Sequence, residues 1–357
     1  MKSKNTGYIE QLDHLRFFAA AVVLLFHASI YAAAAGPRYD QVQPGGWLWP
    51  TIVGQGHIGV QLFMVISGFI LAVISHDKEI NVWRFYWNRI LRIYPLLTFI
   101  VALGFYSLPK EETSRFLIAL LPIFNISRYY GEFGGQAWSI AIELQFYLLF
   151  PIFQAALRNG PRYHIGAILF LILIRIAVYS MNGAVHAFAF LTPFGEFDVF
   201  LIGHLCGWLY MRGKLNLSNP LWLVGSFVAL NAYIWAVFSS GTFYSVAPAN
   251  APPECQSWYW IIHLDVLALL FSVLLVAYLQ MRWRVVGSAL LSALGRYSYS
   301  LYLWHMFVVM LVLKWELPFP ALVTLALTIP ISWASYHLIE EPFLVRRVRY
   351  VTHRSDG

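Results

Sequence analysis

The chain has 357 residues, of which 59% are hydrophobic and only 11% are charged. A soluble domain is roughly 45–50% apolar and about 25% charged, so this composition excludes a protein that faces water on every side. The net charge of +7 is typical of membrane proteins with basic cytoplasmic loops. No basic run carries base-reading or stacking residues, so we expect no nucleic-acid partner.

A helix needs about 20 apolar residues to cross the hydrocarbon core of a bilayer. By this measure the sequence predicts an all-α fold, a single polytopic transmembrane helix bundle over residues 1–357. In chain order its ten spans are 13–34, 57–75, 90–108, 137–157, 163–181, 187–211, 220–239, 258–280, 297–315 and 319–340. Two apolar pieces, 115–125 and 285–294, are too short to span and are expected at the interface or as re-entrant segments, which leaves eleven spans as an alternative.

The loop charges predict the orientation of the bundle. With the N-terminus in the cytoplasm, 18 of the 24 Lys and Arg residues lie on the inner side, five on the outer side, and Arg175 within a span. This asymmetry predicts that both termini are cytoplasmic. The outer loops at 35–56, 109–136 and 240–257 are rich in Gly, Pro and aromatic residues and are expected to form an outward-facing vestibule.

The two ends and the cysteines add little. The polar start Met1–Gln11 precedes an apolar stretch that is too long for a signal-peptide core, so no cleavable signal is expected. Cys206 falls in an apolar span and Cys255 in a polar loop, a pair that indicates neither a disulfide framework nor a metal site.

Ionisable side chains within the spans are the strongest functional signal, because charge in the bilayer core is costly and usually faces the bundle interior. These residues are His27, Glu143, Arg175, Glu196, Asp198, His204, His263, Asp265 and His305. For Arg175, Glu196 and Asp198 we favour structural ion pairing. For His204 and His263 we favour hydrogen bonds between helices, and Asp265 is left open.

His27 is the leading candidate for chemistry. It lies eleven residues beyond Arg16, or about 16 Å of helix, which places it near the membrane midplane. An imidazole titrates near neutral pH and suits a general base or a covalent nucleophile. A neutral histidine that bonds two helices together is the structural alternative. Glu143 has the same two interpretations, and His305 is a second candidate for proton handling.

Arg89 and Arg92 are spaced i, i+3 and therefore share a helix face at the inner surface. Two guanidinium groups on one face can clamp a phosphate. The alternative is ordinary anchoring to anionic lipid headgroups.

Six segments, in order along the chain, resemble motifs of the acyltransferase-3 family of polytopic membrane acyltransferases. The first three are Leu12–Ala20, which leads into the family's Arg, ten residues, His spacing at Arg16 and His27; Gly59–Phe69; and the Arg-x-x-Arg step at Arg89 and Arg92. The last three are Trp138–Tyr147, Gly295–His305 and Glu341–Phe343. His14 and Met64 depart from the family pattern, which has Gly and Phe at these positions.

The resemblance implies acyl transfer from cytoplasmic acyl-CoA to a hydroxyl of a cell-envelope or exported carbohydrate, as in surface-glycan O-acetyltransferases. Acetyl is the favoured group, and acyl-CoA is a co-substrate with no permanently bound cofactor. CoA phosphates would lie against the cofactor-binding residues Arg16, Arg89 and Arg92. A break in the helix at Ser67 and Gly68 would admit the pantetheine arm.

The resemblance also implies roles for individual residues. His27 is expected to act as base or transient acyl carrier, with Glu143 orienting it or fixing the acceptor. The substrate-binding candidates are Ser67, Trp138, Ser139, Tyr299 and His305. Trp138, Trp304 and Tyr299 would stack on sugar rings, although aromatic residues near interfaces are by default membrane anchors.

The family members act at membranes, and a multi-pass protein of a bacterial inner membrane is expected, with lipid and envelope-polysaccharide biosynthesis proteins as partners. Members often carry a fused esterase-like domain, which the chain lacks, so it is expected to act alone or to hand over to a separate protein. Two other functions stay open. One is a polysaccharide or lipid-linked sugar exporter whose path is lined by the intramembrane charges. The other is a non-catalytic member of a biosynthetic complex.

Overall fold

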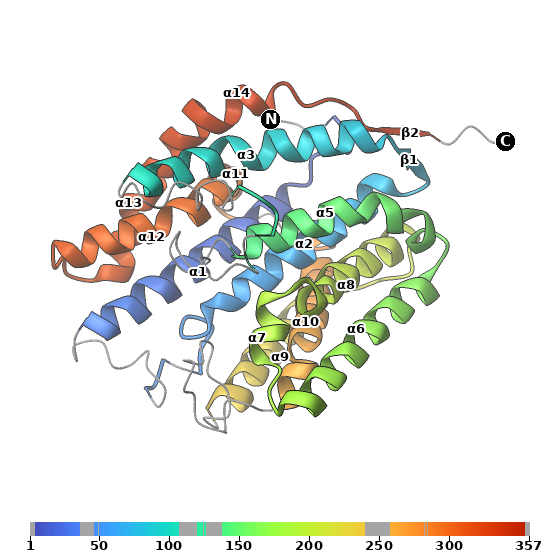
Figure 1. Ribbon diagram of the computed structural model, residues 1–357, viewed down its shortest axis with the longest axis horizontal. Coiled ribbons are helices and arrows are strands. Elements are labelled where there is room, and N and C mark those ends of the chain that lie inside the picture. The colour runs from blue at the N-terminus through green and yellow to red at the C-terminus, as the bar shows by residue number, and fades with distance from the viewer. Residues whose placement is uncertain are drawn as a thin grey trace.

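The computed structural model describes residues 4–35, 46–48, 50–106, 120–123, 125, 138–239, 258–281, 283 and 285–353. The predicted vestibule loop 240–257, most of 109–136 and half of 35–56 lie outside these residues, as does most of the short apolar piece at 115–125. Within them the chain is a bundle of helices with one two-stranded ribbon (Figure 1).

The helices of this bundle are α1 Glu10–Ala35, α2 Gly59–Ser75, α3 Val82–Tyr106, α5 Trp138–Leu157, α6 Pro161–Asn182, α7 His186–Leu191, α8 Pro193–Met211, α9 Pro220–Phe238, α10 His263–Leu279, α11 Ser288–Arg296, α12 Ser298–Lys314, α13 Pro320–Ser335 and α14 Glu341–Leu344. Short 3-10 turns precede α2 and α10, and a π-helical turn, Tyr336–Glu340, joins α13 to α14. The strands are β1 Lys78–Ile80 and β2 Val351–His353.

Six helical segments of the described chain are long and apolar enough to cross a membrane: Glu10–Ala34, Gly56–Ser75, Trp138–Leu157, Pro161–Asn182, Pro220–Phe238 and Pro320–Leu344. The apolar helices α10 and α12 have 17 residues each and are shorter than a full span. The prediction of an all-helical, multi-pass membrane protein is therefore confirmed. The predicted number of ten spans stays a prediction.

Several helix boundaries differ from the predicted ones. The predicted span 187–211 is two helices, because Thr192 is extended and Pro193 starts α8, where its missing N–H costs nothing. Helix α3 begins at Val82, because the Asn81 side chain accepts a hydrogen bond from Arg84 N at 3.0 Å and caps the helix. Arg89 and Arg92 consequently lie in the second and third turns of α3 and not at its start.

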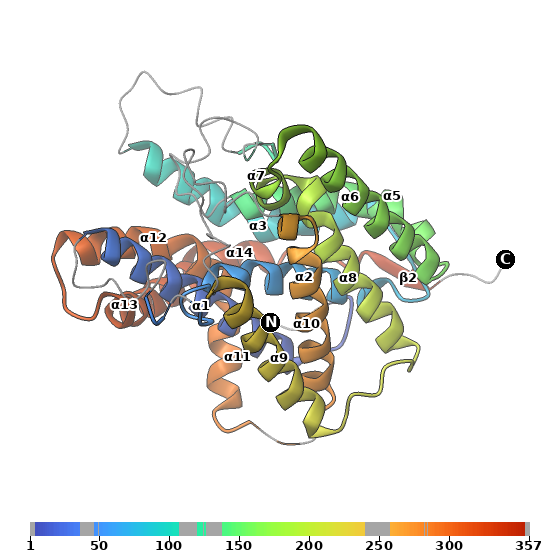
Figure 2. The same cartoon turned by 90° about the horizontal axis from the view of Figure 1, so that it is seen from below.

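Helix α2 lies inside the bundle, where it packs against α8, α1 and α10 (Figure 2). It is a continuous helix, so the predicted break at Ser67 and Gly68 is wrong. Gly68 instead lets α8 approach, because a Cβ atom on Gly68 would lie 2.0 Å from the carbonyl oxygen of Phe200. The glycine is required by helix packing and not by a ligand.

The two ends of the chain meet on one side of the bundle. Tyr350 N donates to the Asn5 side-chain oxygen at 2.8 Å, and β1 pairs antiparallel with β2, with Lys78 opposite His353. Because the segments before the first span and after the last lie side by side, the geometry agrees with an even number of crossings. Which side of the membrane they occupy rests on the loop charges.

Candidate active site

A cavity of about 300 Å³ lies at the end of the bundle where the two chain termini meet. Its wall comes from α1, α2, α3, α5, the α11–α12 junction and both terminal segments. Six basic side chains line it: Lys4, Arg16, Arg89, Arg92, Arg296 and Arg347. Only two carboxylates, Asp13 and Glu143, share that wall. We call this space the basic cavity, and its excess of positive charge suits a ligand with several negative charges.

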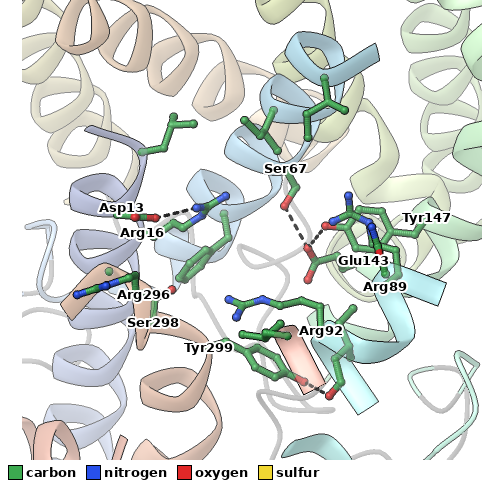
Figure 3. Close-up of a pocket in the computed structure, with 18 of the residues that line it drawn as sticks. Asp13, Arg16, Ser67, Arg89, Arg92, Glu143, Tyr147, Arg296, Ser298 and Tyr299 are labelled. Carbon is green, nitrogen blue, oxygen red and sulfur yellow. Dashed lines mark hydrogen bonds and ion pairs between the residues drawn. The ribbon is translucent and has the colours of Figure 1, made fainter. Parts of the chain in front are cut away.

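Arg16 and Arg92 extend into the basic cavity from opposite walls (Figure 3). Each has one acidic partner: Arg16 donates to Asp13 at 2.9 Å, and Arg92 donates to the buried Glu340 at 3.1 Å. Their side chains remain 31% and 28% accessible. Since a guanidinium has five N–H donors, each group is oriented by one bond and keeps donors for a ligand.

Arg89 is held more tightly than its neighbour on α3. Its guanidinium carbon lies 4.5 Å from the ring centre of Tyr147 and 4.9 Å from that of Phe85. The same group donates to the Tyr350 hydroxyl at 3.1 Å. Cation–π contacts on this scale fix the side chain as part of the cavity wall. The predicted i, i+3 pair thus consists of one arginine held by two rings and a hydroxyl and one held by a carboxylate.

Glu143 lies across the cavity from Arg16 and accepts two hydrogen bonds on one oxygen, Oε1 (Figure 3). The donors are Ser67 Oγ at 3.1 Å and Tyr147 Oη at 2.5 Å. The structure therefore gives Glu143 two hydroxyl partners, one from α2 and one from α5. These partners differ from His27, which Glu143 was expected to orient in one of its two predicted roles. Tyr147 was not singled out from the sequence.

His27 pairs instead with His305. Nε2 of His305 lies 3.1 Å from Nδ1 of His27, and the two rings stack with centroids 5.1 Å apart. Nδ1 of His305 lies 2.6 Å from the carbonyl oxygen of Tyr302, an acceptor, so this nitrogen carries the proton. In the neutral pair, His305 Nε2 then accepts from His27 Nδ1–H. This arrangement leaves Nε2 of His27 with its lone pair.

The histidine pair lies next to the basic cavity without lining it. The cavity reaches Ser139 and Tyr302, whose hydroxyls lie 2.7 Å apart. The ring of Tyr302 is 5.7 Å from that of His305, so Tyr302 separates the cavity from the pair. The structure brings most of the predicted residues together in two adjoining layers, with the arginines on one side and the histidines on the other.

Two predicted sugar-stacking residues have other surroundings. Trp138 is buried against Phe190, with ring centroids 4.6 Å apart, and it does not line the cavity. Tyr299 does line it, but its hydroxyl donates to the Ile93 carbonyl at 2.8 Å.

Three basic residues of the lining, Lys4, Arg296 and Arg347, were counted from the sequence only as cytoplasmic charge. Arg296 belongs to the late motif. Its neighbour Gly295 packs so closely on α1 that a Cβ atom would lie 2.0 Å from the Asp13 carbonyl oxygen. Nothing in the sequence singled out Arg347.

A second group of charged residues lies away from the cavity. Arg175 of α6 donates to Asp198 of α8 and, at 2.7 Å, to Asp265 of α10. We call these three residues the Arg175 cluster. The expected ion pairing of Arg175 with Asp198 is confirmed, and Asp265 is a second partner. Glu196 takes no part in it, because it accepts instead from the Gln61 amide at 3.0 Å.

The other intramembrane histidines bond helices together, as expected. His204 Nδ1 lies 2.8 Å from Nε2 of His164, and His263 Nδ1 lies 2.8 Å from the Tyr233 hydroxyl. His14, one of the two departures from the motif, is likewise structural. Its Nδ1 lies 2.7 Å from the Tyr278 hydroxyl, which ties α1 to α10.

Comparison with known proteins finds relatives named as a membrane-bound transacylase and as O-acetyltransferases. The curated relatives include a membrane-bound transacylase, BcsY of Komagataeibacter xylinus, 29% identical over 318 residues that cover 82% of this chain and 71% of the relative. An O-acetyltransferase of Staphylococcus aureus MRSA252 is 24% identical over 99% of this chain and 60% of its own length. The O-acetyltransferase OatA of S. aureus NCTC 8325 is 25% identical over 96% of this chain and 58% of the relative.

The chain therefore spans about three fifths of the length of these S. aureus relatives. No solved structure matches it. A family model described as an acyltransferase domain matches residues 9–337, which include both layers of the site except the parts contributed by the two terminal segments. The chain belongs to the acyltransferase-3 family and is a membrane acyltransferase.

Proposed function

We propose that the protein moves an acyl group, with acetyl favoured, from cytoplasmic acyl-CoA to a hydroxyl of a cell-envelope or exported carbohydrate. The proposal places it in a bacterial inner membrane with both termini in the cytoplasm. Support for the reaction comes from relatives named as a transacylase and as O-acetyltransferases. Support for the orientation comes from the loop charges and the meeting of the two chain ends.

The observation that carries the proposal is the basic cavity with a histidine pair behind its inner wall. CoA is a multiply charged phosphate ester at one end and a thioester at the other. The guanidinium groups of Arg16 and Arg92 match phosphate geometry and hold the anionic end. The apolar residues Val60, Phe63 and Met64 continue the lining inward and suit the uncharged pantetheine arm.

Nε2 of His27 supplies the chemistry in either of two ways. As a base it takes the proton of the acceptor hydroxyl while the oxygen attacks the thioester carbonyl; the C–S bond breaks and the thiolate leaves, taking up a proton to become free CoA thiol. As a carrier it attacks the carbonyl itself, releases the thiol, and passes the acyl group to the acceptor oxygen. Both routes need the lone pair that the bond to His305 leaves free.

The acceptor approaches from the side opposite the basic cavity in this proposal. A thioester made in the cytoplasm and a glycan modified outside must meet within the membrane. A histidine about 16 Å along α1 from Arg16 lies at the depth where the two can meet. Lipid and envelope-polysaccharide biosynthesis proteins are the expected partners, and no permanently bound cofactor takes part.

The test uses purified protein in lipid vesicles with acetyl-CoA and a panel of carbohydrate acceptors, while free thiol release is followed. We expect acceptor-dependent thiol release, with acetyl ester on the acceptor. Glycans from cells with and without the gene, compared by mass spectrometry, identify the natural acceptor. Absence of thiol release with every acceptor would contradict the proposal and favour an exporter or a non-catalytic partner.

A further inference from the structure

The segment after α14, residues 345–353, runs back along α3 beside the basic cavity, and we call it the C-terminal strap. Asn88 of α3 holds it with two hydrogen bonds: its amide nitrogen donates to Val348 O at 2.7 Å, and its oxygen accepts from Val348 N at 2.9 Å. Asn81 N donates to Tyr350 O at 2.8 Å. With the β1–β2 pairing, these bonds fix the backbone of the strap.

Two strap side chains, Arg347 and Tyr350, line the basic cavity. Nε of Arg347 donates to the Leu344 carbonyl at 3.2 Å, which orients the guanidinium. Tyr350 accepts from Arg89 and so couples the strap to α3. The strap's other arginines, Arg346 and Arg349, are exposed and do not line the cavity. Among the strap arginines, only Arg347 is therefore positioned to meet a ligand there.

Arg347 lies beside two other guanidinium groups, those of Arg92 and Arg89. Burial, together with the nearby guanidiniums of Arg92 and Arg89, lowers the pKa of Arg347 to about 10. The Arg347 guanidinium stays cationic at neutral pH. It therefore experiences repulsion from the guanidiniums of Arg92 and Arg89. A polyanion bound among them would relieve this repulsion. Because the strap lies outside the last span, this contact is at the polar end of the cavity, away from Ser139 and Tyr302.

We propose that Arg347 is a phosphate ligand for the nucleotide end of the donor, so that the C-terminal strap selects CoA thioesters over thioesters that lack a nucleotide. The inference rests on the proposed function for the identity of the donor. It adds a binding residue outside the matched acyltransferase domain, on a part of the chain to which the sequence motifs assign no role.

The first experiment measures binding without catalysis. CoA, 3′-dephospho-CoA and pantetheine are titrated into purified, full-length protein in phosphatidylcholine vesicles. The variants are Arg347→Gln and the matched control Arg346→Gln, which removes the same charge from the adjacent strap residue. Arg347→Lys retains the charge without the planar fork. Thermal denaturation of each variant confirms that it is folded.

We expect Arg347→Gln to weaken CoA binding at least tenfold, which is about 1.4 kcal/mol, and Arg346→Gln to change it less than twofold. Arg347→Lys should fall between them. Pantetheine binding should be the same in all four proteins. If 3′-dephospho-CoA binds equally to wild type and Arg347→Gln, the 3′-phosphate is the group bound; if it shows the same loss, the diphosphate is.

Equal CoA affinity in wild type and Arg347→Gln overturns the inference and leaves the proposed function standing. Failure of the wild-type protein to bind CoA overturns both. CoA binding that depends on Arg347, without acyl transfer to any acceptor, supports the inference and counts against the proposed reaction. Loss of pantetheine binding in Arg347→Gln would show that the residue only maintains the cavity, and would also overturn the inference.

Discussion

The basic cavity and the Arg175 cluster both hold arginines inside an apolar bundle, but their surroundings differ. Arg175 is completely buried and bonds to two carboxylates, Asp198 and Asp265. Arg16 and Arg92 have one carboxylate each, keep about a third of their side-chain surface accessible, and face a cavity. The first arginine is neutralised by the protein, whereas the others present charge to a space that a ligand can enter.

The difference separates intramembrane charges that hold helices together from those available for binding. Both kinds are costly in a membrane, so cost alone does not distinguish them. The distinction comes from the acidic partners and from access. Mutations should therefore act on stability at the Arg175 cluster and on catalysis at the cavity and the histidine pair.

The largest effect is expected for His27→Ala, which removes the base or carrier beside the cavity. Acyl transfer should fall about 100- to 10,000-fold in kcat, with the melting temperature nearly unchanged. Thiol release per folded protein measures the loss. His204→Ala, which removes a buried histidine bonded to His164, is the control and should keep its activity. An active His27→Ala protein would be incompatible with the proposed chemistry.

Arg175→Met should destabilise the protein by about 3–5 kcal/mol, because it leaves Asp198 and Asp265 buried without their cation. Denaturant unfolding in detergent measures the change, and the surviving folded fraction should be as active as wild type. Arg162→Met, on the exposed start of the same helix, should alter stability by less than about 0.5 kcal/mol. A stable but inactive Arg175→Met would contradict the distinction between a stabilising Arg175 cluster and a catalytic cavity with its histidine pair.

His305→Ala should lower kcat by about tenfold, a part of the 100- to 10,000-fold effect of a complete base, because His27 then loses the acceptor that fixes its tautomer. The KM for acetyl-CoA should not change. His305→Gln offers a carbonyl that can accept from His27 Nδ1 and should restore much of the rate. If Gln gives no recovery beyond Ala, His305 acts on the substrate or a proton directly.

The smallest effect is expected for Ser67→Ala, since Tyr147 still donates to Glu143 when the serine hydroxyl is gone. Loss of the hydrogen bond from Ser67 to Glu143 should cost about 0.5–1.5 kcal/mol of stability and change acyl transfer by less than about threefold. Thermal denaturation and thiol release together measure the two effects. A loss of activity above 100-fold would indicate that the Ser67 hydroxyl contacts the substrate.

Part of the site follows from local pattern. The i, i+3 spacing predicts that Arg89 and Arg92 share a face, and the structure brings both to the basic cavity. Packing then gives them different partners, because Arg89 lies against the rings of Tyr147 and Phe85, whereas Arg92 pairs with Glu340. These aromatic partners come from a neighbouring helix and the preceding turn, so spacing alone does not reveal the difference.

The pairings that were not predicted from the sequence are contacts between residues far apart in the chain. His27 and His305 are 278 residues apart, and Arg175 and Asp265 are 90 residues apart. Either pairing depends on how whole helices cross, which hydropathy does not encode. Gly68 shows the same limit, because the glycine that was expected to admit a ligand in fact admits helix α8.

Composition and hydropathy by themselves determined a helical membrane protein, because water exclusion and backbone hydrogen bonding in lipid leave few other solutions. Motif order pointed to the family and to Arg16 and His27. Only the tertiary structure decided which charges are neutralised, that His305 lies within hydrogen-bond distance of His27, and that Arg347 reaches the cavity from the C-terminal strap. Those outcomes depend on close packing between segments far apart in the chain. A shift of one helix would therefore change which side chains meet.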